Sequence, residues 1–185
     1  MSPLEDGRYA RRRTIHSSRL PRPRMADLRQ APEESRHAAA EAEVSLTQTT
    51  LSLIIDGAVP SGDVLGTAEI AGVLAAKRAG ELLPLAHPAV MTELVVRGVP
   101  DRAAGVIRVT AEATATGRSG VEPQVLAAVS IASITILDML RSIDATVAVH
   151  SIRIAGEAAP EAPRGHAPAG TRGPKRAAPR RSGPA

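Results

Sequence analysis

The stretch SGDVLGTAEIAGVLAAKRAGELLPLAHP, residues 61–88, decides the fold. Its apolar and small residues recur at helical spacing, which predicts a helix over residues 63–79. Small residues fill one face of this helix, so another backbone can lie close against it. Asp63 stands where a helix N-cap is expected, and Gly80 is typical of a C-terminal stop. The two prolines of LLPLAHP then hold His87 in an extended segment.

The sequence on both sides of this stretch alternates between strand and helix patterns. The order of these patterns is β-α-α-β-β-α-β, which is the ferredoxin-like plan with one additional helix. We therefore expect an α+β fold, with helices packed on an antiparallel sheet. The predicted strands are residues 36–46, 90–99, 106–115 and 147–154, and the other predicted helices are residues 47–56 and 123–143.

Composition excludes several kinds of site. The chain has no cysteine, which rules out thiolate zinc sites, disulfides and thiol nucleophiles. Aromatic residues make up 1 % of the sequence, so the core must consist of Ala, Val, Leu and Ile, and base stacking is nearly excluded. The longest apolar run, residues 123–137, contains polar residues and is too short to span a membrane. We interpret it as a helix buried in protein.

The basic charge of the chain lies in its two ends. Residues 1–30 contain eight basic and three acidic residues, and residues 156–185 contain six basic and two acidic residues. Residues 31–155 contain nine basic and 14 acidic residues, so the middle of the chain is acidic. An acidic core argues against nucleic-acid binding.

The same change in composition predicts three segments. Residues 25–156 should form one folded domain. We expect residues 1–24 to be a disordered basic extension, or sequence upstream of a start at Met25. Residues 157–185 are rich in Pro, Ala, Gly and Arg, and we expect a disordered basic tail there.

Four blocks of this sequence resemble, in order, those of the cyclic pyranopterin monophosphate synthase family: LSLIIDG, GDVLGTAEIAGVLAAKR, LLPLAHP and SGVEPQVLAAVSIASITILDM. That family catalyses the second step of molybdenum cofactor biosynthesis. Its reaction rearranges a cyclised GTP derivative and closes a cyclic phosphate with loss of pyrophosphate. The resemblance implies the same α+β fold, no cofactor and no metal ion, and a cytoplasmic enzyme. It also implies a homo-oligomer, a hexamer built as a trimer of dimers, with sites at a subunit interface.

The resemblance also points to individual site residues. It implies that His87, Glu122 and Asp138 are catalytic, because they match a histidine, a glutamate and an aspartate of the family pattern. Further residues stand at or beside the other site positions, and we expect them to contact the substrate. These are Ser61, Gln124, Met139 and Arg141, with Lys77 as a more distant candidate.

Three of these positions depart from the family pattern. Ser61 and Arg141 each replace a lysine, and Gln124 replaces a glutamate. A buried lysine can exchange a proton, whereas arginine keeps its charge and glutamine takes no proton. Arg141 can still hold a phosphate group. The lysine that the family carries near its C-terminus, beside a Gly-Gly-Lys-Ser-Gly run, has no counterpart after Ile154.

Each candidate also has a structural interpretation. His87 suits a loop histidine bonded to backbone, and Glu122 suits the first turn of a helix. Asp138 and Arg141 suit an ion pair on a helix face, and burial of Asp138 in its apolar helix would require a partner. Glu122 and Asp138 are separated by 16 residues, about 24 Å along a helix. If both are functional, the site is shared between subunits.

Three functions follow from these observations. The leading hypothesis is a divergent enzyme with cyclase or lyase chemistry on a phosphorylated or heterocyclic small molecule, nucleotide- or pterin-derived. The second is the unaltered synthase reaction. The third is an inactive paralogue that binds a ligand or assembles with an active partner. The expected partners are a small molecule and further copies of the chain, with no membrane and no nucleic acid for the core.

Overall fold

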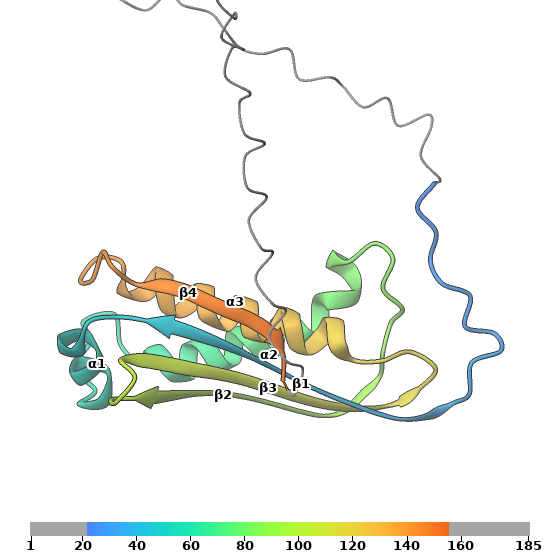
Figure 1. The fold of residues 1–185 in the computed structure, drawn as a ribbon, viewed down its shortest axis with the longest axis horizontal. Helices are drawn as coiled ribbons and strands as arrows, with labels where there is room; N and C mark the ends of the chain where they lie inside the picture. The colour runs from blue at the N-terminus through green and yellow to red at the C-terminus, as the bar shows by residue number, and fades with distance from the viewer. Residues whose placement is uncertain (1–21, 156–185) are drawn as a thin grey trace, which may run out of the picture.

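The computed structural model describes residues 22–155. The expectations for residues 1–24 and 157–185 lie outside this part, except that residues 22–24 are exposed and carry no regular structure. The seven expected elements occur in the expected order (Figure 1). They are β1 (Glu34–Ser45), α1 (Gln48–Ile55), α2 (Val64–Leu82), β2 (Met91–Asp101), β3 (Val106–Gly117), α3 (Glu122–Leu140) and β4 (Ala148–Ile154).

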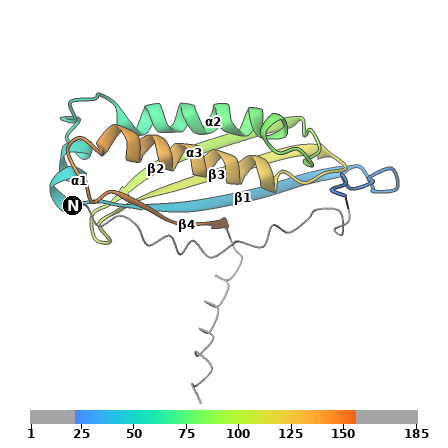
Figure 2. The ribbon, with the colours of Figure 1, turned by 90° about the horizontal axis from the view of Figure 1, so that it is seen from above.

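The four strands form one antiparallel sheet in the order β2-β3-β1-β4. β1 and β3 pair along their whole length, from Glu34 opposite Gly117 to Ser45 opposite Val106. Helices α2 and α3 lie side by side on one face of this sheet (Figure 2). This arrangement is ferredoxin-like, which confirms the predicted fold class.

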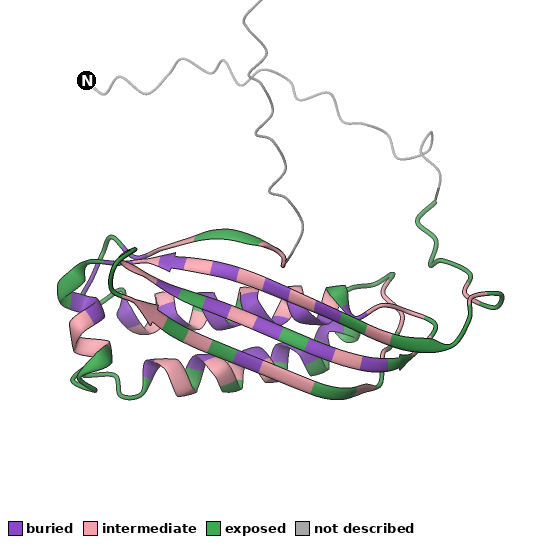
Figure 3. Cartoon of the chain, turned by 60° about the horizontal axis from the view of Figure 1, so that its bottom comes forward, coloured by how far each residue is buried: buried purple, intermediate pink, exposed green. Residues whose placement is uncertain are grey.

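The core lies between the sheet and the two long helices. Alternate residues of β1 and β3 are buried, as Figure 3 shows by the alternating colours along the strands. No Phe, Tyr or Trp occurs within residues 22–155, so the core consists of aliphatic side chains, as expected. The buried residues of the two central strands are Ala38, Ala40, Ala42 and Val44 in β1, and Ile107, Val109, Ala111, Ala113 and Ala115 in β3.

Helix α2 begins where the sequence predicts but ends later. Its N-cap is Asp63, whose carboxylate accepts a hydrogen bond from the Gly66 amide at 2.9 Å. The predicted stop at Gly80 is wrong, because the helix continues to Leu82. Leu83 then leaves the helical conformation, with φ −103° and ψ 102°. Pro84 follows it, and a residue before proline is biased towards extended backbone.

Helix α3 is apolar and ends three residues earlier than predicted, at Leu140. By length and composition alone it could span a membrane. One of its faces packs on α2 and the sheet, whereas Ile131 and Ile134 are exposed by 38 % and 52 %. The predicted buried helix is therefore buried on one side only within the single chain, and α3 is a core helix of the fold.

At Gly72 the backbone of α2 lies close against α3. A Cβ atom placed there would lie 2.9 Å from Cγ1 of Val96 and 3.0 Å from the Ala128 carbonyl oxygen. The buried residues of α2 are small, as predicted. Their partner is a helix of the same chain rather than a second subunit.

Substitution of Gly72 tests this contact. Gly72→Ala should destabilise the protein by about 1–3 kcal/mol, because the added methyl group overlaps atoms of two other elements. Gly80→Ala is a matched control in the same helix, since the nearest atom to its Cβ is 3.9 Å away. Removing that glycine from a helix interior should stabilise the protein by up to about 1 kcal/mol. Urea unfolding should therefore show opposite shifts, and equal shifts would contradict the contact.

A buried carboxylate, Asp144, joins α1 to the segment between α3 and β4. One of its oxygens accepts hydrogen bonds from the amide and hydroxyl of Thr47, both at 2.9 Å. The other accepts from the amide and hydroxyl of Thr146, at 3.0 and 2.6 Å. Burial alone would raise the pKa of Asp144, but the donors of Thr146 and Thr47 outweigh it and hold the pKa well below its ordinary value.

Asp144→Asn should lower the free energy of unfolding at neutral pH by about 1–3 kcal/mol, because two of the four donors lose their acceptor. The pKa of Asp144 is lower in the folded state, so its contribution is complete above the ordinary value of 3.8 and decreases as pH falls below it. The stability difference between wild type and variant should therefore shrink in acid. Asp138→Asn, at an exposed carboxylate, is the control. A difference that is constant with pH would contradict the assignment.

Candidate functional site

His87 lies in the extended segment between α2 and β2, where Pro84 and Pro88 restrict the backbone. Its imidazole is half-buried, and Nε2 lies 2.8 Å from the carbonyl oxygen of Ala26. A carbonyl oxygen only accepts hydrogen bonds, so Nε2 carries the proton and donates it. His87 is thus a loop histidine bonded to backbone, which is one of the two interpretations of this residue. Its Nδ1 makes no hydrogen bond within residues 22–155.

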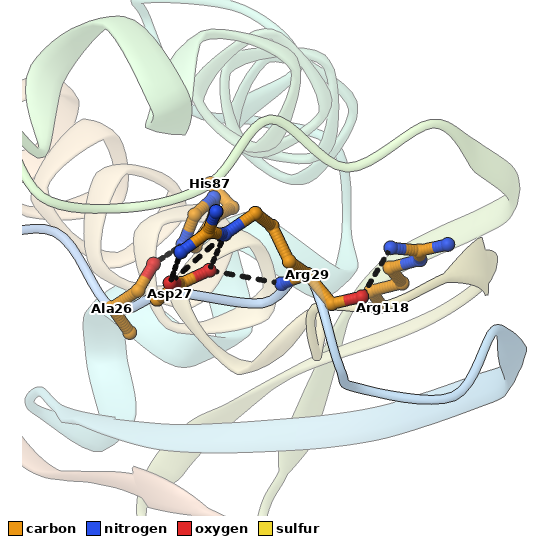
Figure 4. A network of polar contacts seen from close by, with 5 residues as sticks. All are labelled: Ala26, Asp27, Arg29, His87 and Arg118. Carbon is orange, nitrogen blue, oxygen red and sulfur yellow. Dashed lines mark hydrogen bonds and ion pairs between the residues drawn. The ribbon is translucent and has the colours of Figure 1, made fainter.

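The surface beside His87 is an open groove of about 550 Å³. Residues 26–29 form one wall, and residues 117–119, at the end of β3 and the start of the β3–α3 connection, form another. Arg29 and Arg118 bring two guanidinium groups to it (Figure 4). The groove therefore places an imidazole and two cations directly before the start of α3.

Glu122 and Gln124 lie in the first turn of α3. The Glu122 carboxylate is exposed and occupies the space where a Cβ atom of residue 120 would lie if Gly120 had a side chain. A carboxylate at this position is favourable in any helix, so its presence alone assigns no role. Gln124 is buried, and its Oε1 has no hydrogen-bond partner within residues 22–155.

The other candidates gather at the opposite end of α3. The Ser61 hydroxyl donates to the carbonyl oxygen of Met139 at 3.1 Å, which joins the α1–α2 loop to the last turn of α3. Asp138 and Arg141 lie in the same turn and are both exposed. Within the described residues no ion pair joins them, so the expected helix-face pair is not formed. Asp138 is not buried and so needs no buried partner, because it shares the outward face of α3 with Ile134.

Lys77 belongs to neither group. It is exposed on α2 and lines a separate depression of about 460 Å³ with Val73, Met91 and Glu93. Lys77 does not line the groove beside His87, and the bond of Ser61 to Met139 does not involve it.

The candidates therefore form two groups separated by the length of α3. His87, Glu122 and Gln124 lie at its first turn, and Ser61, with the last turn of α3, lies at its end. A helical rise of 1.5 Å per residue separates the Cα atoms of Glu122 and Asp138 by about 24 Å. One small molecule cannot contact both groups within a single chain. Within residues 22–155, no three His, Asp or Glu side chains come together to hold a metal ion.

Comparison with known proteins identifies the family. Residues 25–158 match the model of the MoaC family. The chain belongs to the MoaC family. Its relatives include the cyclic pyranopterin monophosphate synthases of Brucella ovis, Brucella canis and Brucella suis, each 42 % identical over 130 residues. These alignments cover 70 % of this chain and 79 % of each relative, and the family expected from the four sequence blocks is confirmed.

Two residues of the MoaC-family chain that line the His87 groove, Arg29 and Arg118, are absent from the set that the sequence suggested. Arg118 could have been predicted from the sequence, because it lies in the run Gly117-Arg118-Ser119-Gly120 directly before the block that contains Glu122. Arg29 could not, since it lies in an irregular segment before the first strand. The catalytic and substrate-binding roles of all the candidates stay predictions.

Proposed function

We propose that this MoaC-family protein is an enzyme with cyclase or lyase chemistry on a phosphorylated heterocyclic small molecule, and that it converts the cyclised GTP derivative slowly. The observation that carries this proposal is the position of Ser61. The resemblance places a lysine there, but the Ser61 hydroxyl is bonded to the Met139 carbonyl and holds a loop to α3. It supplies neither a positive charge nor an ammonium proton.

The groups that remain suit a shorter series of proton transfers. His87 offers an unbonded Nδ1 as proton acceptor. The exposed Glu122 carboxylate follows the β3–α3 connection, which lines the His87 groove. At the other end of α3, Asp138 is an exposed carboxylate and Arg141 an exposed guanidinium. Arg141 would bind a phosphate through two parallel hydrogen bonds and keep its charge throughout. We place this chemistry in the cytoplasm.

A second copy of the chain completes the site in this proposal. Ile131, Ile134 and Asp138 follow one another at helical spacing on the outward face of α3. The two isoleucines are exposed and lie between the two groups of candidates. Antiparallel contact of this face with its equivalent in a second copy would bury them and bring the first turn of α3 in one copy near the last turn of α3 in the other. We infer a dimer of this kind, three of which make a hexamer.

Light scattering of the full chain tests the assembly. A hexamer has a mass of about 115 kDa, six times the 19.2 kDa of one chain. Ile134→Glu should reduce this mass, because it would place a charge in the α3 contact. Ile55→Glu, at an exposed isoleucine of α1, should leave it unchanged. A monomeric wild-type protein at micromolar concentration would refute both the assembly and the shared site.

The activity prediction concerns the missing proton-transfer groups. Pyrophosphate release from the cyclised GTP derivative should be about 10²–10⁴-fold slower than in a synthase with its lysines, the usual loss for one general acid or base. The combined variant Ser61→Lys, Gln124→Glu and Arg141→Lys should recover part of this rate. Adding His87→Ala to that variant should abolish the gain, with the assembly intact as the control.

The second candidate function is the unaltered synthase reaction. The name of the Brucella relatives favours it, as does their 42 % identity to this chain. The same assay separates the two functions. A wild-type rate equal to that of a synthase with its lysines would overturn the divergent function and establish the synthase reaction.

A further inference from the structure

A short segment before the first strand, residues 26–29, lies across His87 (Figure 4). The segment is stiffened by its own charges. The Asp27 carboxylate accepts a hydrogen bond from the Arg29 amide at 3.1 Å and binds the Arg29 guanidinium at 2.7–3.1 Å. These hydrogen bonds from Arg29 hold the pKa of Asp27 below its ordinary value.

Arg118 fastens this segment to the body of the fold. Its guanidinium donates to the carbonyl oxygen of Arg29 at 3.0 Å. Arg118 belongs to the β3–α3 connection, four residues before Glu122. The guanidinium of Arg29 is already held by Asp27, so it is Arg118 that ties residues 26–29 to the connection.

The contact with His87 has a chemical consequence. The Ala26 carbonyl accepts the Nε2 proton of His87 at 2.8 Å, which fixes the tautomer and limits rotation of the ring. Nδ1 is then the ring atom left to take a proton from another molecule. His87 is thus bonded to a backbone carbonyl at one end of the segment, and Arg118 bonds to the carbonyl of Arg29 at the other end.

We propose that Arg118 is a positioning residue: through residues 26–29 it holds His87 with the proton on Nε2 and leaves Nδ1 to exchange a proton with substrate. The catalytic use of Nδ1 rests on the function proposed above, whereas the orientation of the ring does not. Asp27 and Glu33 also line this groove, and Arg29 neutralises the charge of Asp27.

Nuclear magnetic resonance of the full-length ¹⁵N-labelled protein tests the orientation without any assay. At about pH 8.5 the His87 ring should show an Nε2–H signal protected from exchange with water, because the Ala26 carbonyl accepts this proton. His87→Gln assigns this signal. In Arg118→Ala its exchange should accelerate about tenfold or more, the factor expected when one hydrogen bond from a charged donor is lost. Arg118→Lys should retain most of the protection.

Two further variants make the test specific. Arg102→Ala removes an exposed arginine from the β2–β3 turn and should leave the Nε2–H signal unchanged. Asp27→Ala loosens residues 26–29 but keeps Arg118, and it should also accelerate exchange, so the test survives if Arg118→Ala fails to fold. A wild-type ring protonated on Nδ1, or unchanged protection in both Arg118→Ala and Asp27→Ala, would overturn the proposal.

Kinetics provide the second measurement. Arg118→Ala should lower kcat about tenfold with little change in KM, and Arg118→Lys should recover most of the loss, because the residue acts on the orientation of His87. A rise in KM with unchanged kcat would assign Arg118 to substrate binding and overturn the positioning role. Absence of turnover in every variant would count against the proposed function alone, since the resonance measurement decides the orientation independently.

Discussion

The contact of α2 with α3 at Gly72 fixes the position of both groups of candidate residues. With no side chain at Gly72, α2 lies directly against the Ala128 carbonyl and the Ala132 methyl group. The loop before α2 therefore reaches the last turn of α3, where Ser61 bonds to Met139. The segment after α2 reaches the first turn, where His87 lies beside residues 117–119. The pair of helices α2 and α3 thus has candidate residues at both of its ends.

The aliphatic core explains why this contact must be so close. Alanine and valine side chains bury little apolar area each, so stability depends on many short contacts and on the absence of voids. Hydrogen bonds add to the packing where three segments meet. Asp144 accepts four of them from Thr47 and Thr146 and so joins the start of α1 to the segment that leads into β4. The turn that ends α3 at Leu140 places this carboxylate.

The order of the elements and the fold class could be predicted because they rest on patterns that extend over many residues. β3 alternates along its whole length, and α2 repeats small residues over five turns. Features that depend on single residues were harder to predict. Gly80 lies inside α2, because Pro84 decides where the helix ends. α3 is apolar on nearly every side, so its sequence did not indicate that Asp138 and Ile134 face outward. The bond from Arg118 to the Arg29 carbonyl joins residues 89 positions apart and has no sequence pattern.

The two ends of α3 differ in what they can contribute to a reaction. The first turn contains Glu122 and lies beside His87, and both side chains are of a type that can exchange protons. The last turn carries the Asp138 carboxylate and the Arg141 guanidinium, which keeps its charge, and the nearby Ser61 hydroxyl is bonded to the Met139 carbonyl. In the shared site that we propose, Arg141 of one copy would hold the phosphate. Asp138 of that copy would add a carboxylate to His87 and Glu122 of the other. A lysine at position 61 would add an ammonium group that can move a proton, which Ser61 does not supply. This arrangement favours a substrate that needs few proton transfers and a firmly held phosphate.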